Sequence, residues 1–261
     1  MNSANLKGLH RLLGVMARLR DPDNGCPWDR EQTPRSIAPW TIEEACEVAE
    51  AAEAGDTGHW REELGDLLFH VVFHARLAEE EGLFDFDTVA GEVAVKLEDR
   101  HPHVFGEEDV PAVTDLNVQW EQRKSREREH VDEHLPLHLP ALMRAYKLQK
   151  RAAAVGFDWP DEKGPRGKIA EELEELEQAR QSDALSRQER VSEELGDLLF
   201  AIVNYARHLG VEPEQALRAA NRKFIRRFRF IESRLAREGL RPGDVDLEYL
   251  DGLWEKAKRG E

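Results

Sequence analysis

The 261-residue sequence is poor in cysteine, in aromatic residues and in positive charge. Its two cysteines, Cys26 and Cys46, are too few for a disulfide scaffold, and they lack the CxxC spacing of zinc and redox sites. No apolar run approaches the roughly 18 residues that span a bilayer, and residues 1–13 lack the apolar core of a secretion signal. We therefore expect a cytoplasmic protein without a membrane partner.

The charge balance argues against binding to nucleic acid. Lys and Arg number 37 against 53 Asp and Glu, which gives a formal charge of −16 and repels phosphate backbones over most of the surface. Charged residues make up 34% of the chain, above the roughly 25% of an average domain, while 40% are hydrophobic. This composition is typical of long solvated helices around a real core.

An internal repeat dominates the sequence. The string EELGDLLF occurs unchanged at 62–69 and at 193–200, and EEACEV at 43–48 matches EELEEL at 171–176. Two further landmarks recur in the same order. Trp28 matches Trp159, and Lys96 matches Lys223. Landmarks in one order at nearly one shift indicate two copies of one domain.

The break between the copies is expected where two prolines interrupt the helical pattern. We predict a first domain at 1–130, a linker at 131–140 and a second domain at 141–261. The apolar residues recur with a period near 3.6, and glycine and proline cluster at 21–27, 101–111 and 160–167, which suits connections. The fold class is therefore all-α, with two tandem repeated helical-bundle domains.

Each copy carries two pairs of carboxylates at helical spacing. Residues three apart on a helix share a face, and if the two helices of a copy pack side by side, four carboxylates converge. Oxygen-only ligand sets suit Mg²⁺ or Mn²⁺. Acidic runs are commonly solvated helix faces, yet a solvated face has little reason to keep the same spacing twice. The expected metal ligands are Glu44, Glu47, Glu63 and Asp66 in the first copy and Glu172, Glu175, Glu194 and Asp197 in the second.

Other phosphate and metal chemistries fit poorly. A di-iron bundle needs Glu-x-x-His on two helices, and Glu98 with His101 has no equivalent in the second copy. His70 and His74 correspond to Ala201 and Tyr205, so we interpret them as packing residues. P-loop, Nudix and GxGxxG patterns all fail at required positions.

A basic helix is expected at 221–231. Its apolar stripe consists of Phe224, Ile225, Phe228 and Ile231, and Asn221 falls on the same side, where an unpaired amide is costly. The remaining faces carry cations that suit phosphate binding or a solvated surface, among them Lys223, Arg226 and Arg227.

These motifs resemble the MazG nucleoside triphosphate pyrophosphohydrolases of the all-α NTP pyrophosphatase superfamily. The resemblance rests on EExxE followed by ExxD in both copies, and on GCPWDREQT at 25–33, HPHVFG at 101–106, LPALMRAYKLQKRAAAVGFDW at 139–159 and NRKFIRRF at 221–228. It covers nearly the whole chain.

The resemblance implies Mg²⁺-dependent hydrolysis of a (deoxy)nucleoside triphosphate such as ATP to the monophosphate and pyrophosphate, with water attacking the α-phosphorus. It implies that Glu172, Glu175, Glu194 and Asp197 are the catalytic set, that the protein is a homodimer, and that the second copy is the main catalytic one. Ala94 stands at the position of Asn221 in the first copy, which agrees with that asymmetry. The residues that the resemblance places at the nucleotide are Lys168, Glu171, Asn221, Lys223 and Trp254.

The alternative is a non-enzymatic acidic helical protein that binds partner proteins through its carboxylates. Spacing alone leaves the nucleobase preference and the number of metal ions open.

Overall fold

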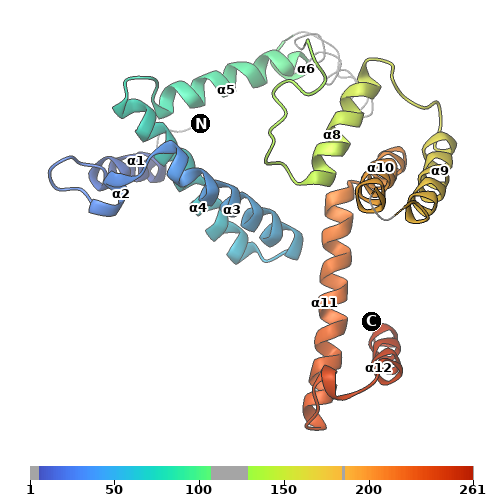
Figure 1. The fold of residues 1–261 in the computed structure, drawn as a ribbon. Coiled ribbons are helices and arrows are strands. Elements are labelled where there is room, and N and C mark those ends of the chain that lie inside the picture. The colour runs from blue at the N-terminus through green and yellow to red at the C-terminus, as the bar shows by residue number, and fades with distance from the viewer. Residues whose placement is uncertain (1–5, 107–128, 184–185, 261) are drawn as a thin grey trace. The chain divides into compact units, whose positions relative to one another are not determined.

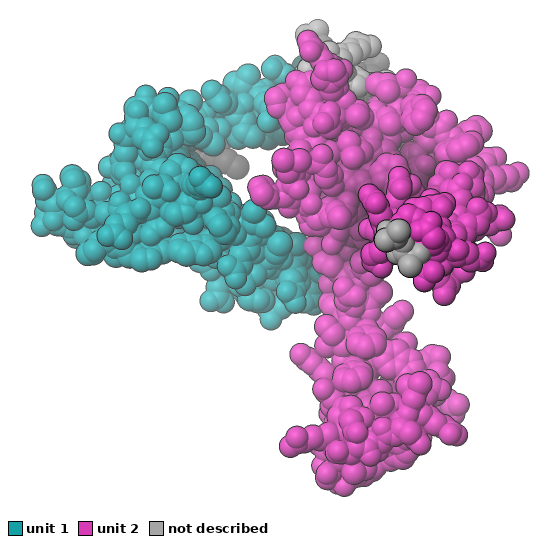
Figure 2. Space-filling model, viewed as in Figure 1, with its two compact units in different colours: residues 1–110 teal, residues 111–261 magenta. Residues whose placement is uncertain are grey.

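The computed structural model describes residues 6–106, 129–183 and 186–260. The chain separates into two compact units, Met1–Val110 and Pro111–Glu261, which Figure 2 shows in teal and magenta. The described residues form helices and no β-strand, which confirms the all-α prediction (Figure 1). Within these residues, every helix is too short or too polar to cross a membrane.

The first unit is built around one long helical hairpin. Its helices are α1 (Lys7–Leu19), α2 (Pro27–Glu31), α3 (Pro34–Ala54), α4 (Thr57–Glu80), α5 (Phe86–Arg100) and α6 (Pro102–Phe105). The core joins Met16 of α1 and Ile37 of α3 to Val72, Phe73 and Leu77 of α4. Burying these side chains holds α1 and α3 against α4.

Local sequence fixes the ends of the α3–α4 hairpin. Thr33 and Ser36 form a capping box before α3, and Pro34 occupies the first turn, where no backbone donor is lost. Gly55 ends α3 with a φ of 74°, a left-handed conformation that glycine adopts without strain. Asp56 then caps α4 by accepting hydrogen bonds from the backbone N–H groups of Gly58 and His59. The tight turn sets the register of the two acidic helices.

The second unit repeats the hairpin and adds a long helix. Its elements are α8 (Ala141–Ala154), α9 (Lys163–Arg180), α10 (Arg187–His208), α11 (Pro213–Arg237), the short 3₁₀ helix η2 (Pro242–Asp244) and α12 (Leu247–Arg259). Helices α9 and α10 pack closely, and α8 lies against α10. A separate cluster of Ile231, Leu235 and Leu253 joins the end of α11 to α12.

Two details differ from the pattern read in the sequence. Residues 160–167 are only partly a connection, because α9 already begins at Lys163. Residues 131–140 pack on α8, where Leu135 is buried and Arg151 donates to the carbonyls of Val131 and Glu133. The domain boundaries at 130 and 141 stay a prediction.

Candidate functional site

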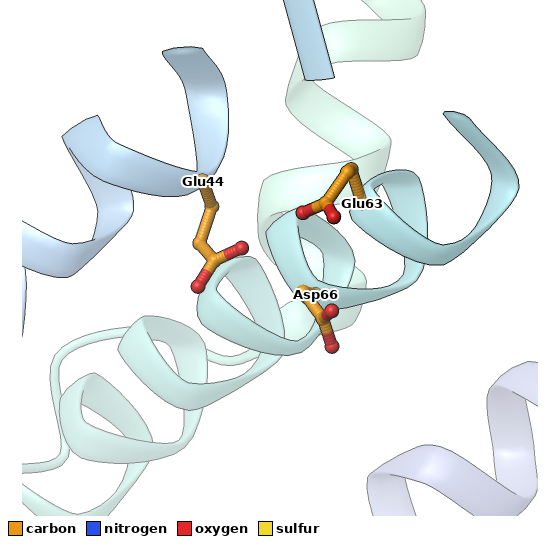
Figure 3. A group of neighbouring side chains, drawn as sticks. All are labelled: Glu44, Glu63 and Asp66. Carbon is orange, nitrogen blue, oxygen red and sulfur yellow. The ribbon is translucent and has the colours of Figure 1, made fainter. Parts of the chain in front are cut away.

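Three carboxylates of the first unit come together across the α3–α4 hairpin. Glu44 extends from α3 toward Glu63 and Asp66 of α4 (Figure 3), and one ligand oxygen of each lies within 4.8 Å of the others. Glu63 is buried, with 7% of its surface exposed. The two helices thus supply a compact oxygen donor set of the kind that hard divalent cations prefer.

The second unit reproduces this arrangement across α9 and α10. Glu172, Glu194 and Asp197 place their ligand oxygens within 4.8 Å of one another. Glu172 is 4% exposed, and its Oε2 is buried without a hydrogen-bond partner. A buried, unpaired carboxylate oxygen is costly, and a cation bound there would remove the cost.

The fourth acid of each predicted set lies near the three. Burial and the charges of Glu47 and Asp66 raise the pKa of Glu44, and burial and the charge of Glu47 raise the pKa of Glu63. In the second unit, burial and the charge of Glu172 raise the pKa of Glu175, against the opposing effect of Lys168. These carboxylates repel one another, and a bound cation would relieve that repulsion.

Histidines surround the first-unit carboxylates. Nδ1 of His59 lies 3.0 Å from Oε1 of Glu63, and Nε2 of His70 lies 3.7 Å from Oε1 of Glu44. Thr41 Oγ1 lies 3.1 Å from Nε2 of His74, and burial lowers the pKa of both His70 and His74. The two histidines pack between α3 and α4 as expected, and His70 also borders the acidic group.

A lysine occupies the second-unit group instead. Nζ of Lys168 lies 2.6 Å from Oε1 of Glu172 and 2.9 Å from Oε1 of Glu171. The hydrogen bonds to these two carboxylates raise the pKa of Lys168, so its ammonium group stays charged. Lys168 and Glu171, predicted as nucleotide contacts, thus lie directly beside the predicted metal ligands.

The remaining predicted contacts lie on α11 and α12. The guanidinium of Arg227 stacks over the ring of Trp254 at 5.4 Å, and Trp254 also contacts Phe224. Helix α12 packs on the end of α11 that is remote from the α9–α10 hairpin (Figure 1). These residues belong to other helices than the carboxylates of α9 and α10; they are Asn221, Lys223, Arg226 and Arg227 on α11 and Trp254 on α12.

The expected inward position of Asn221 is wrong. Asn221, Phe224 and Ile225 are exposed, whereas Phe228 and Ile231 are partly or fully buried. The reason is that α12 covers only the later turns of α11, so the apolar stripe is partnered along half its length.

Sequence reasoning missed the groups that surround the carboxylates. His59 precedes Glu63 by four residues, His70 follows Asp66 by four, and Thr41 precedes Glu44 by three. The helical spacing that paired the acids also places these side chains on the same faces. The same helical spacing, extended by one turn, predicts their positions.

Comparison with known proteins identifies the family. The profile of the MazG nucleotide pyrophosphohydrolase domain matches residues 32–105 and 166–229. The chain is 49% identical over 259 residues to the nucleoside triphosphate pyrophosphohydrolase of Escherichia coli K12, covering 97% of this chain and 98% of that protein. It is 44% identical over 255 residues to the nucleoside triphosphate pyrophosphohydrolase/pyrophosphatase MazG of Thermotoga maritima, covering 96% and 95%. The predicted carboxylate ligands of both hairpins lie inside the matched segments, and the chain belongs to the MazG nucleotide pyrophosphohydrolase family.

Proposed function

We propose that this protein hydrolyses (deoxy)nucleoside triphosphates, ATP among them, to the nucleoside monophosphate and pyrophosphate, and that the α9–α10 hairpin is its main active site. The observation that carries the proposal is the group of Glu172, Glu194 and Asp197, whose ligand oxygens lie within 4.8 Å of one another. The activities named for the relatives support the same reaction.

The residues fit a divalent cation. The donor set is oxygen only, one donor is buried and unpaired, and the carboxylates repel one another, all of which favour Mg²⁺, with Mn²⁺ as the alternative. Glu172, Glu175, Glu194 and Asp197 would hold it, as would Glu44, Glu47, Glu63 and Asp66 in the first unit. When bound, the cation supplies charge neutralisation for the triphosphate and polarisation of the reacting oxygens.

The chain's own residues supply the proton transfer and the positioning. Water adds to the α-phosphorus, the bond from that phosphorus to the α,β-bridging oxygen breaks, and pyrophosphate leaves. Glu175 lies outside the tightest group of three, and burial and the charge of Glu172 raise its pKa, so Glu175 would accept the proton of that water. Lys168 is placed to exchange its bond with Glu172 for a substrate phosphate oxygen.

The residues predicted at the nucleotide on α11 and α12 would join the carboxylates through a second copy of the chain. Asn221, Lys223, Arg226, Arg227 and Trp254 lie on α11 and α12, and the neighbouring apolar side chains of α10 and α11 are exposed. A homodimer that covers these faces would bring one chain's α11 to the other's carboxylates. The exposed set is Leu195, Leu199, Ile202, Leu217, Phe224 and Ile225. Light scattering should give twice the chain mass of 29.9 kDa, and a monomer at micromolar concentration would contradict the dimer.

The reaction is tested by its products. The purified protein is incubated with each nucleoside triphosphate and Mg²⁺, and the products are separated by ion-exchange chromatography. We expect monophosphate and pyrophosphate, and no product after EDTA treatment. Diphosphate and phosphate would place the attack at another phosphorus, and no hydrolysis of any nucleotide would favour the non-enzymatic interaction protein. Water labelled with ¹⁸O should place the label in the monophosphate, whereas label in pyrophosphate would exclude α-phosphorus attack.

A further inference from the structure

Three polar side chains beside the first-unit carboxylates have no equivalent in the second unit. They are Thr41 of α3 and His70 and His74 of α4. At the matching positions the second copy carries Ile169, Ala201 and Tyr205. Any effect of these three side chains on a carboxylate group is therefore confined to the first unit.

The hydroxyl proton of Thr41 is committed to the backbone. Oγ1 of Thr41 lies 3.2 Å from the carbonyl oxygen of Ile37, and because a carbonyl cannot donate, the hydroxyl donates to it. Toward the histidines, the same oxygen can therefore only accept. Nε2 of His74 lies 3.1 Å from it and Nδ1 of His70 lies 3.5 Å from it, so these two ring nitrogens carry the N–H groups.

This tautomer of His70 turns a lone pair toward a carboxylate. With the proton on Nδ1, Nε2 is the acceptor nitrogen of the neutral ring, and it lies 3.7 Å from Oε1 of Glu44. His70 is 5% exposed, and within the described residues its Nε2 makes no hydrogen bond. Two lone pairs that face each other in a buried place repel, and a cation between them would be bound favourably.

The separation of these two atoms suits a metal ion better than a shared proton. A charged N–H···O hydrogen bond would bring Nε2 and Oε1 to about 2.7–2.9 Å. Two donors bound to one ion at about 2.1 Å lie roughly 3–4 Å apart, which includes the observed distance. A metal-ligating histidine almost always donates its other ring N–H to a neighbouring group, as Nδ1 does toward Thr41.

His70 is also on the correct face of its helix. It follows Asp66 by four residues on α4, so the two side chains lie on one face. Glu44, Glu63 and Asp66 already place ligand oxygens within 4.8 Å of one another. Nε2 of His70 would add a nitrogen donor at the Glu44 edge of this group.

We propose that His70 is a nitrogen ligand of the first-unit metal site, and that this site selects a divalent transition-metal ion such as Mn²⁺ over Mg²⁺. The inference rests on the proposed binding of a cation by the first-unit carboxylates. Imidazole nitrogen favours transition metals, whereas Mg²⁺ prefers oxygen ligands. The second-unit group has Ala201 at this position and consists of carboxylates alone. The two units then differ in the metal that each prefers.

The test is pulsed electron paramagnetic resonance of the full-length protein with less than one Mn²⁺ per chain and an excess of Mg²⁺. The Mg²⁺ fills the oxygen-only site, and the wild type should show the ¹⁴N coupling of a directly bound imidazole. His70→Ala introduces the residue of the second copy, and His70→Gln keeps a polar side chain of similar size. The ¹⁴N coupling should be lost in both variants.

Calorimetric titration measures the selectivity of the same variants. The affinity of the first unit for Mn²⁺ should fall at least about tenfold in both His70 variants, and that for Mg²⁺ by less than about threefold. Thr41→Val is the matched control, because it removes the acceptor of Nδ1 and keeps the imidazole. It should weaken Mn²⁺ binding severalfold and keep the ¹⁴N coupling, and circular dichroism shows which variants are folded.

Three results would overturn the inference: Mn²⁺ bound to the wild type without a ¹⁴N coupling, a coupling that survives in a folded His70 variant, and equal affinities of the first unit for the two ions. None of them touches the proposed hydrolysis, which the product assay measures. If the wild type bound neither Mn²⁺ nor Mg²⁺, the proposed metal sites would fail together with the inference.

Discussion

In the α3–α4 hairpin, the buried carboxylate Glu63 faces His59, whereas in the α9–α10 hairpin the buried Glu172 holds Lys168. Trp40 stands at the position of Lys168 in the first copy and stacks on Trp28 instead. The two copies thus keep the same acids, but the buried one lies on the second helix of the first hairpin and on the first helix of the second, and the groups that balance the acids also differ. The carboxylates therefore define the kind of site, while the neighbouring side chains decide how each copy uses it.

The largest expected difference between the copies is in stability. Phe73→Ala should lower the free energy of unfolding of its unit by about 3–5 kcal/mol, because a fully buried ring is removed from the core. Asn204 stands at the position of Phe73 in the second copy, and Asn204→Ala, the matched control, should cost about 1 kcal/mol, since it removes only hydrogen bonds to Arg207. Urea denaturation measures both. Equal losses of unfolding free energy would contradict the view that only the first copy fills its core with a buried ring at this position.

Metal binding should stabilise both hairpins. At a concentration about 100 times Kd, Mg²⁺ should add about 2.7 kcal/mol to the unit that binds it. Glu175→Ala should remove the part of the shift that belongs to the second unit, and Glu47→Ala the part that belongs to the first. Differential scanning calorimetry with and without Mg²⁺ measures the stabilisation. If the double variant kept the full wild-type stabilisation by Mg²⁺, the metal would bind elsewhere.

Replacing Lys168 should make the second site resemble the first. Lys168→Ala should lower kcat/KM about tenfold, because a phosphate contact is lost. It should also tighten Mg²⁺ binding severalfold, since the ammonium no longer competes for Glu172. Steady-state kinetics and Mg²⁺ titration test the two effects, and Lys168→Arg is the control that keeps the charge. Weaker Mg²⁺ binding in Lys168→Ala would contradict the competing role of the lysine.

The smallest effect concerns an arginine that the copies share. Arg76 binds Glu80 on its own helix at 2.8 Å, whereas its counterpart Arg207 binds Asp158 before α9. Burial tends to raise the pKa of Asp158, but the hydrogen bonds from Arg207 and His208 outweigh it, so the pKa is lowered overall. The pair therefore stabilises the fold above the unfolded-state pKa and loses that effect as pH falls through the folded-state pKa.

Asp158→Asn should cost about 1 kcal/mol at neutral pH and flatten the loss of stability in acid. Thermal unfolding between pH 7 and pH 3 measures it, with Glu80→Gln as the first-unit counterpart. A variant that keeps the wild-type acid dependence would show that the pair contributes nothing through its charge.

Helical spacing was enough to predict the acidic groups, because a short turn between two helices brings ExxE against ExxD. Helical spacing did not predict the exposure of Asn221. Which turns of the α11 apolar stripe are buried depends on where α12 folds back onto α11, and no local sequence pattern encodes that position. The pairing of Lys168 with Glu172 was also missed, although the two are four residues apart.

The measurement that tests the central claim most directly is the turnover of Glu172→Gln against Glu44→Gln. These substitutions remove the same carboxylate from the two hairpins and keep the shape of the side chain. Because removing outer partners of a metal site already costs 10- to 100-fold, Glu172→Gln should lower kcat by about 100-fold or more. Glu44→Gln should change it less than about threefold, because the first hairpin lacks a counterpart of Lys168. Equal losses in the two variants, or a larger loss in Glu44→Gln, would contradict the assignment of the main active site to α9 and α10.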